Sequence, residues 1–243
     1  MSPLDRRLRG GLKGLLVGLS LTVFATAIAQ ATEATAAVVW FQEQERGIEP
    51  YPVRLIVTPD FMRSDDGLDD GDFLLFDRRL RRIHSVARAN RTVLVIDGKG
   101  EQADPPQTLS FSVRQHRDDK APAIAGVSPL EVELVADGEI CQAALVAPGF
   151  LEPVRAALQE FSLALAVQQL RTLAHTPGDM QTPCFLSRYL YATDFYLALG
   201  MPLADWNAAG ERRELTRYDT DVAVDVRLFE VPDDFTVIPA ATQ

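Results

Sequence analysis

The chain has 243 residues, 47% of them hydrophobic, and carries 34 Asp and Glu against 24 Lys and Arg, a formal net charge of −10. Such an acidic chain repels phosphate backbones, so we expect no nucleic-acid partner. The length and the apolar fraction suit a globular protein with a sizeable core.

The first residues are typical of a secretory signal peptide. Four cations precede an apolar run from Leu15 to Ile28, and small residues stand at Ala27 and Ala29. The run is short for a hydrocarbon core of about 30 Å, although an uncleaved anchor is the alternative. We predict a signal peptide over 1–29 and a periplasmic mature protein with no stable membrane insertion. Its net charge would be −13.

Short strands separated by turn residues are predicted from residue 38 to residue 96. Apolar and mixed residues alternate from Tyr51 to Val57, as expected for a strand with one buried face. Short strand-like segments at 73–76, 83–86 and 92–96 follow at intervals of about ten residues, which is typical of an antiparallel meander. Further strands are predicted at 109–114, 130–135 and 138–146, after a Gly- and Pro-containing loop over 97–107.

Two helices are predicted in the following segment. Residues 152–173 are rich in helix formers, and Pro153 suits the first turn. A second helix should begin at Thr182, as N-cap before Pro183, and should stop at Gly200. The two helices would form an antiparallel hairpin.

The strand pattern returns after the helices, because apolar and polar residues alternate from Val222 to Leu228. A helical insert between strands of one sheet favours one domain over two. We therefore predict a single α+β domain over 30–243, with the helical insert at about 148–203.

Cys141 and Cys184 are the two cysteines of the chain. In an exported protein, an even pair is most simply a disulfide. The bond would close a 43-residue loop, and the chain-entropy model values that at about 4 kcal/mol. A redox or metal-binding pair is the alternative, but the sequence has no C-x-x-C motif.

Metal and catalytic motifs are not recognisable in the sequence. The acidic run 65–72 fails as a calcium loop, because aligning its glycine with that of an EF-hand puts Leu68 at a ligand position. His84, His116 and His175 lack partners at zinc-ligand spacing. We expect no metal, no cofactor and no enzymatic activity, although a catalytic carboxylate pair would be recognisable only in space.

Two stretches of the chain show a pattern known from other proteins. The first is Val53–Ile96, with Arg63 and Asp65 near the end of one strand and Asp77 after the next apolar run; the second is Leu228–Pro232, leading to Phe235. Together they resemble exported bacterial domains of unknown function with a fold like that of the lipoprotein carriers LolA and LolB. The resemblance implies a curled, incompletely closed antiparallel sheet, or half-barrel, with the helical hairpin on its concave face. Related folds bind acyl chains or lipidated proteins there.

Five residues of the helical segment are candidates for lining a ligand cavity: Phe161, Leu165, Phe185, Tyr189 and Tyr196. Core packing against the sheet is the simpler explanation of these residues, and an apolar cavity with a partly wet mouth is the other. With the resemblance, they suggest a periplasmic binding or carrier-like protein for an apolar or acyl-type ligand. The alternative is a structural or interaction protein of the cell envelope with a filled core, whose partner would be an envelope protein.

Overall fold

The computed structural model describes residues 32–117 and 122–240. The predicted signal peptide, 1–29, lies outside the described residues. The strands are β1 Glu33–Gln44, β2 Tyr51–Val57, β3 Phe61–Asp65, β4 Phe73–Asp77, β5 Arg82–Ala87, β6 Thr92–Asp97, β7 Phe111–His116, β8 Leu130–Ala136, β9 Glu139–Ala147, β10 Met201–Trp206, β11 Arg212–Asp225 and β12 Thr236–Pro239. The helical elements are α1 Glu152–Thr172, η1 Leu173–His175, η2 Gly178–Met180, α2 Pro183–Leu186, η3 Ser187–Tyr191 and η4 Val226–Phe229.

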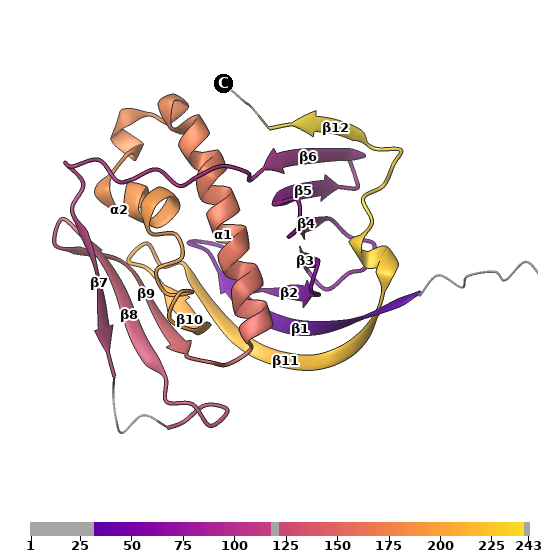
Figure 1. The fold of residues 1–243 in the computed structure, drawn as a ribbon, viewed down its shortest axis with the longest axis horizontal. Coiled ribbons are helices and arrows are strands. Elements are labelled where there is room, and N and C mark those ends of the chain that lie inside the picture. Colours follow the sequence, from indigo (N-terminus) through magenta and orange to yellow (C-terminus); the bar gives the residue numbers. More distant parts are fainter. Residues whose placement is uncertain (1–31, 118–121, 241–243) are drawn as a thin grey trace, which may run out of the picture. The chain divides into compact units, whose positions relative to one another are not determined.

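All twelve strands belong to one sheet, in the order β12-β6-β5-β4-β3-β2-β1-β11-β10-β9-β8-β7. Neighbours are antiparallel except β12 and β6, which are parallel. The strands β12 and β7 are the two edges, so the sheet is open, and it curls around α1 (Figure 1). The predicted α+β fold with a curled, incompletely closed antiparallel sheet is confirmed.

The curl of the sheet is centred on its two longest strands, β1 and β11. Their pairing shifts register between Ala36 and Val38 and again between Trp40 and Phe41. Such bulges bend a strand and increase its twist, which turns one face of the sheet inward. The described residues belong to one compact unit, 31–243.

The helix α1 packs into the concave face because one of its sides consists of small and aliphatic residues. Val154, Ala157 and Ala164 are fully buried there, in a core shared with β1–β5 and β8–β10. The approach of the helix to the sheet is close at Gly98, where an added Cβ would lie 2.4 Å from the Cβ of Ala164. Only glycine fits at that position.

The second helix begins as predicted. The hydroxyl of Thr182 accepts a hydrogen bond from the backbone N–H of Phe185 at 3.2 Å, and Pro183 stands in the first turn. The predicted extension to Gly200 is wrong, because the short α2 passes into the π-helical turn η3 and residues 192–199 form turns.

Two local interactions lie at the end of this helix. The hydroxyl of Ser187 donates to the carbonyl of Pro183 at 2.8 Å, and the N–H of Ala192 donates to the carbonyl of Ser187 in a wide π-type turn. Gly200 has another role than ending a helix. An added Cβ there would lie 2.7 Å from the backbone of Ala147, so the close approach of β10 to β9 requires glycine.

The convex face of the sheet has its own apolar cluster, which we call the convex-face cluster. Its buried residues come from β1, β2, β4, β5 and β6 and from η4. The C-terminal segment covers it, with the ring of Phe229 stacked on that of Phe61 at 5.6 Å between centroids. The segment then adds β12 to the sheet edge, beside β6 (Figure 1). The predicted strand at 222–228 thus ends earlier, at Asp225, whose side chain caps η4.

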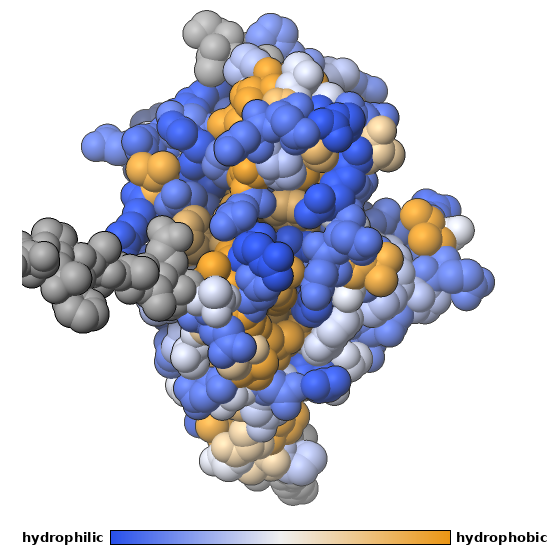
Figure 2. Space-filling model, turned by 90° about the vertical axis from the view of Figure 1, so that its right-hand side faces the viewer, coloured by the Kyte–Doolittle hydropathy of each residue, from blue (hydrophilic) through white to orange (hydrophobic). Residues whose placement is uncertain are grey.

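Apolar side chains on the surface are dispersed. The face shown in Figure 2 has hydrophobic patches with hydrophilic residues between them. The large exposed hydrophobic residues come from many elements and include Leu68, Leu80, Val113 and Ile140. Within the described ranges, no helix is both long and apolar enough to cross a bilayer.

Candidate functional site: a cavity under the helix

A cavity of about 740 Å³ lies between the concave face of the sheet, α1 and the α2–η3 segment. Its apolar wall consists of strand residues from β1–β4, helix residues from α1 and one residue that follows η3: Phe41, Val53, Leu55, Met62, Leu74, Leu158, Phe161, Leu165 and Leu197. The rings of Phe161 and Phe76 meet edge to face at 5.7 Å, which fixes Phe161 against the sheet. The sheet and helix therefore leave an apolar space between them.

The other end of the cavity is polar, because a row of polar residues crosses the sheet there. Tyr51 on β2 pairs with Glu43 on β1, Glu43 with Arg213 on β11, and Arg213 with Asp205 on β10. We call these four residues the polar row. All four line the cavity. On β1 the row follows two buried residues of the same face, Val39 and Phe41, so the lining changes from apolar to polar along the strand.

Arg213 is the centre of the polar row. Its guanidinium lies 2.9 Å from the carboxylate of Asp205 and donates to the hydroxyl of Tyr196 at 2.9 Å. The same guanidinium lies over the ring of Phe41, 4.9 Å from its centroid. Burial raises the pKa of Tyr196 to about 12, so the phenol stays neutral and can accept this hydrogen bond. The arginine is thus held by an acid, a phenol and an aromatic face.

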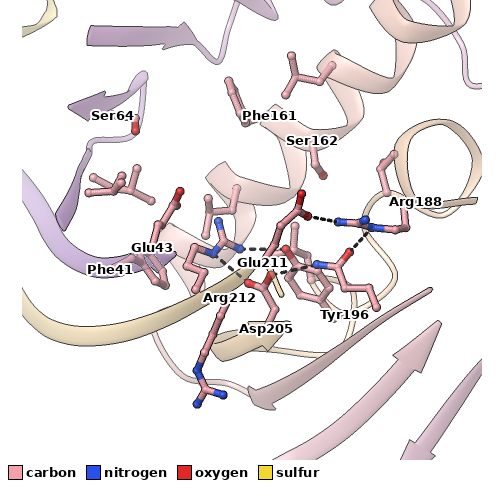
Figure 3. A pocket seen from close by; sticks show the side chains of 18 of the residues that line it. Phe41, Glu43, Ser64, Phe161, Ser162, Arg188, Tyr196, Asp205, Glu211 and Arg212 are labelled. Atoms are coloured by element: carbon pink, nitrogen blue, oxygen red, sulfur yellow. Dashed lines mark hydrogen bonds and ion pairs between the residues drawn. The ribbon is translucent and has the colours of Figure 1, made fainter. Parts of the chain in front are cut away.

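A second ion pair lies at the polar end and involves a residue of η3. Arg188 lies 3.2 Å from the carboxylate of Glu211 and donates to the amide oxygen of Gln142. The amide nitrogen of Gln142 donates to Asp205 at 3.0 Å and joins the two pairs into one network. Figure 3 shows Arg188, Glu211, Asp205 and Tyr196 at one end of the cavity and Ser64 and Phe161 at the other.

Two carboxylates of the polar end form no ion pair within the described residues. They are Glu43 and Glu45, and both line the cavity. The hydroxyl of Tyr51 donates to Glu45 at 2.6 Å, and this bond, more than burial, raises the pKa of Tyr51 to about 12. Burial raises the pKa of Glu43, with Asp205 and Glu45 adding to the effect and Arg213 and Tyr51 opposing it.

One hydroxyl of the cavity wall is also without a partner. The Oγ1 atom of Thr193, just after η3, is buried and has no hydrogen-bond partner among the described residues. A buried unsatisfied hydroxyl costs about 1–3 kcal/mol, so a polar group in the cavity would stabilise the site.

Four of the five residues predicted to line a cavity do so: Phe161, Leu165, Tyr189 and Tyr196. The fifth, Phe185, does not line it and packs its ring against that of Tyr189 at 5.3 Å. Tyr189 is 41% exposed and Tyr196 only 8%, so Tyr189 is near the mouth and Tyr196 forms part of the inner wall. The polar row was not predicted from the sequence. The inward alternation Val39, Phe41, Glu43 is the signal that could have pointed to it.

The predicted disulfide between Cys141 and Cys184 is confirmed. It joins β9 to the start of α2, and α2 continues into the η3 turn that carries Arg188 and Tyr189. The bond therefore holds the segment that forms the mouth of the cavity. Among residues 32–117 and 122–240, no group of three or more His, Cys, Asp or Glu side chains is arranged to hold a metal ion.

Comparisons with known proteins give no family for this chain: no family matches it, and no curated protein is significantly similar. Two solved structures of PNGF-II, in space groups C2 and P21, are similar at 10% and 12% identity, with TM-scores of 0.42 and 0.41. Each covers 85% of this chain, whereas the chain spans only 31% and 32% of theirs. An uncharacterised conserved protein from Thermus thermophilus is similar at 10% identity and a TM-score of 0.38, over 85% of this chain and 91% of that one. Similarity at this level supports no functional argument.

Proposed function

We propose that this protein is a periplasmic binding or carrier-like protein that holds a single-chain, acyl-type ligand in the cavity under α1. The observation that carries the proposal is the cavity itself, which is apolar along α1 and polar at its mouth. Its volume of about 740 Å³ lies within the roughly 300–1,000 Å³ of small-molecule sites. A carrier role agrees with the resemblance to the LolA and LolB fold, and export agrees with the predicted signal peptide and with the disulfide.

The alternative, an envelope interaction protein with a filled core, has less support. Leu158, Phe161 and Leu165 of α1 line the cavity as well as packing against the core, so the space between helix and sheet is only partly filled. An empty apolar cavity costs stability, because its lining loses the contacts of a packed core. A ligand that fills the space would return those contacts.

Uptake of an uncharged, environment-sensitive naphthylamine dye tests this function. Each buried CH₂ group is worth about 0.8 kcal/mol, so straight-chain alcohols should displace the dye about fourfold better per added CH₂ until the cavity is full. The measurement is dye fluorescence against alcohol concentration, below micelle formation.

A matched pair of variants locates the binding. Ser162 lies on α1 and lines the cavity, so Ser162→Trp should obstruct the space between helix and sheet and abolish dye uptake. Ser112 is exposed on β7, outside the cavity, and Ser112→Trp should leave uptake unchanged. If wild type takes up no dye, or if Ser162→Trp takes up as much as Ser112→Trp, the binding function is refuted and the interaction protein becomes the better account.

A further inference from the structure

The charges around the cavity are unequally matched. Three arginines line it, and each has a carboxylate partner: Arg213 with Asp205 at 2.9 Å, Arg188 with Glu211 at 3.2 Å, and Arg212 with Glu214. The two carboxylates that remain, Glu43 and Glu45, form no ion pair among the described residues. Among the residues that the structure describes, the polar end therefore has an excess of negative charge and no arginine free to hold an anion.

We propose that the ligand of this cavity is a cationic single-chain amphiphile, with an ammonium group beside Glu43 and Glu45 and its alkyl chain along α1. This inference rests on the proposed binding function and adds the class of head group.

The position of the two carboxylates suits an ammonium head. Glu43 lies in the polar row, directly after the apolar wall residue Phe41 on the same face of β1. A chain lying along Phe161 and Leu165 would thus bring its head to the carboxylates without crossing polar surface. Tyr51, the first residue of β2, offers an aromatic ring at the same end, and aromatic faces attract ammonium groups.

A fatty-acid anion fits this end poorly. Its carboxylate would approach Glu43 and Glu45 without a free cation to balance them, and like charges in a partly buried site repel. To bind Arg213, it would have to displace Asp205, which is also held by Gln142 at 3.0 Å. A neutral alcohol avoids the repulsion but gains no ion pair.

Three ligands of equal chain length separate these cases: dodecylammonium, dodecanol and dodecanoate. Each displaces the uncharged dye at about pH 8, where the amine is cationic and the acid anionic. We expect dodecylammonium to bind about tenfold more tightly than dodecanol, a difference of about 1.4 kcal/mol. Dodecanoate should bind more weakly than dodecanol.

The double variant Glu43→Gln/Glu45→Gln should bring the affinity for dodecylammonium down to that for dodecanol, while the affinity for dodecanol stays unchanged. The unchanged alcohol binding shows that the variant is folded. Glu139, exposed on β9 outside the cavity, supplies the matched control, and Glu139→Gln should keep the full preference for the ammonium.

The two proposals fail in distinguishable ways. If dodecanol binds and dodecylammonium binds no better, or if the double variant keeps the preference, the cationic head is refuted and the binding function stands. If none of the three ligands displaces the dye or binds, the binding function itself is refuted.

Discussion

Two arginines on opposite faces of the sheet show how differently the same residue type is used. Arg63 on the convex face is only 1% exposed. It donates to the carboxylate of Asp65 at 2.6 Å and to the backbone carbonyls of Leu228 and Asp69 at 2.8 and 3.0 Å. Its guanidinium lies 4.1 Å from the ring centroid of Phe73. Every side of this group is occupied by the protein itself.

Arg213 on the concave face has a similar set of partners, but the network around it is incomplete. Asp205 and Tyr196 hold the guanidinium, while Glu43 beside it forms no ion pair among the described residues and faces the cavity. The hydrogen-bond network around Arg63, which we call the convex network, is complete, and it attaches the C-terminal segment to β3 through the carbonyl of Leu228. The network around Arg213, which we call the concave network, leaves the charge of Glu43 without an ion pair among the described residues and lies beside the cavity. This is the arrangement expected of a binding site.

The largest effect is expected for Arg63→Met. It leaves the carbonyls of Leu228 and Asp69 without their donor and weakens the pairing of Asp65, so the free energy of unfolding should fall by about 3–5 kcal/mol. Urea denaturation measures it. The control is Arg217→Met in the exposed pair with Asp219, which should cost under about 1 kcal/mol. An equal effect of the two changes would show that the convex network is not structural.

Removal of the disulfide should have the second-largest effect on the free energy of unfolding. Replacing Cys141 and Cys184 together by Ala releases a 43-residue loop and should lower the free energy of unfolding by about 2–4 kcal/mol. Amide hydrogen exchange should rise in residues 184–199, which the bond attaches to β9, and stay unchanged in 226–235 on the other face. A rise in both segments would mean that the two faces do not open separately.

Arg213→Met should cost less than Arg63→Met, about 1–2 kcal/mol, because the side chain of Arg213 is 21% exposed and water from the cavity can reach Asp205. The same urea titration compares the two variants directly. A loss as large as that of Arg63→Met would indicate that the concave network also serves chiefly to stabilise the fold.

The smallest effect on the free energy of unfolding is expected for Glu43→Gln, which should raise it, whereas the other changes lower it. Burial raises the pKa of Glu43 above its ordinary value, so ionised Glu43 destabilises the folded state at neutral pH. The variant should therefore be slightly more stable than wild type at neutral pH. The difference should shrink as the pH falls through the raised pKa and vanish below the pKa of the unfolded chain. Thermal unfolding across this pH range measures it, and a less stable variant at neutral pH would contradict the account.

The sequence predicted those parts of the fold that depend on local patterns. The alternation from Tyr51 to Val57 indicated β2, the helix formers after Pro153 indicated α1, and the even cysteine pair indicated the disulfide. The end of the second helix was missed because it depends on a π-type turn at Ser187–Tyr191, which helix propensity does not encode.

The cavity could be predicted only in part. The spacing of Phe161 and Leu165 pointed to the face of α1 that lines it. The polar row depends on the pairing of β2, β1, β11 and β10, and its residues lie as far apart in the sequence as Glu43 and Arg213. Arg63 and Asp65, noted as part of the carrier-like pattern, belong to the convex face and line no part of the cavity.

The central claim is that the cavity holds one amphiphile and selects its head group. Native mass spectrometry of the protein mixed with equal concentrations of dodecylammonium and dodecanoate tests it directly, because the added mass identifies the bound ligand. We predict one bound dodecylammonium per chain in the wild type and none in Ser162→Trp. Equal amounts of both ligands, or the same adduct in Ser162→Trp, would contradict the account.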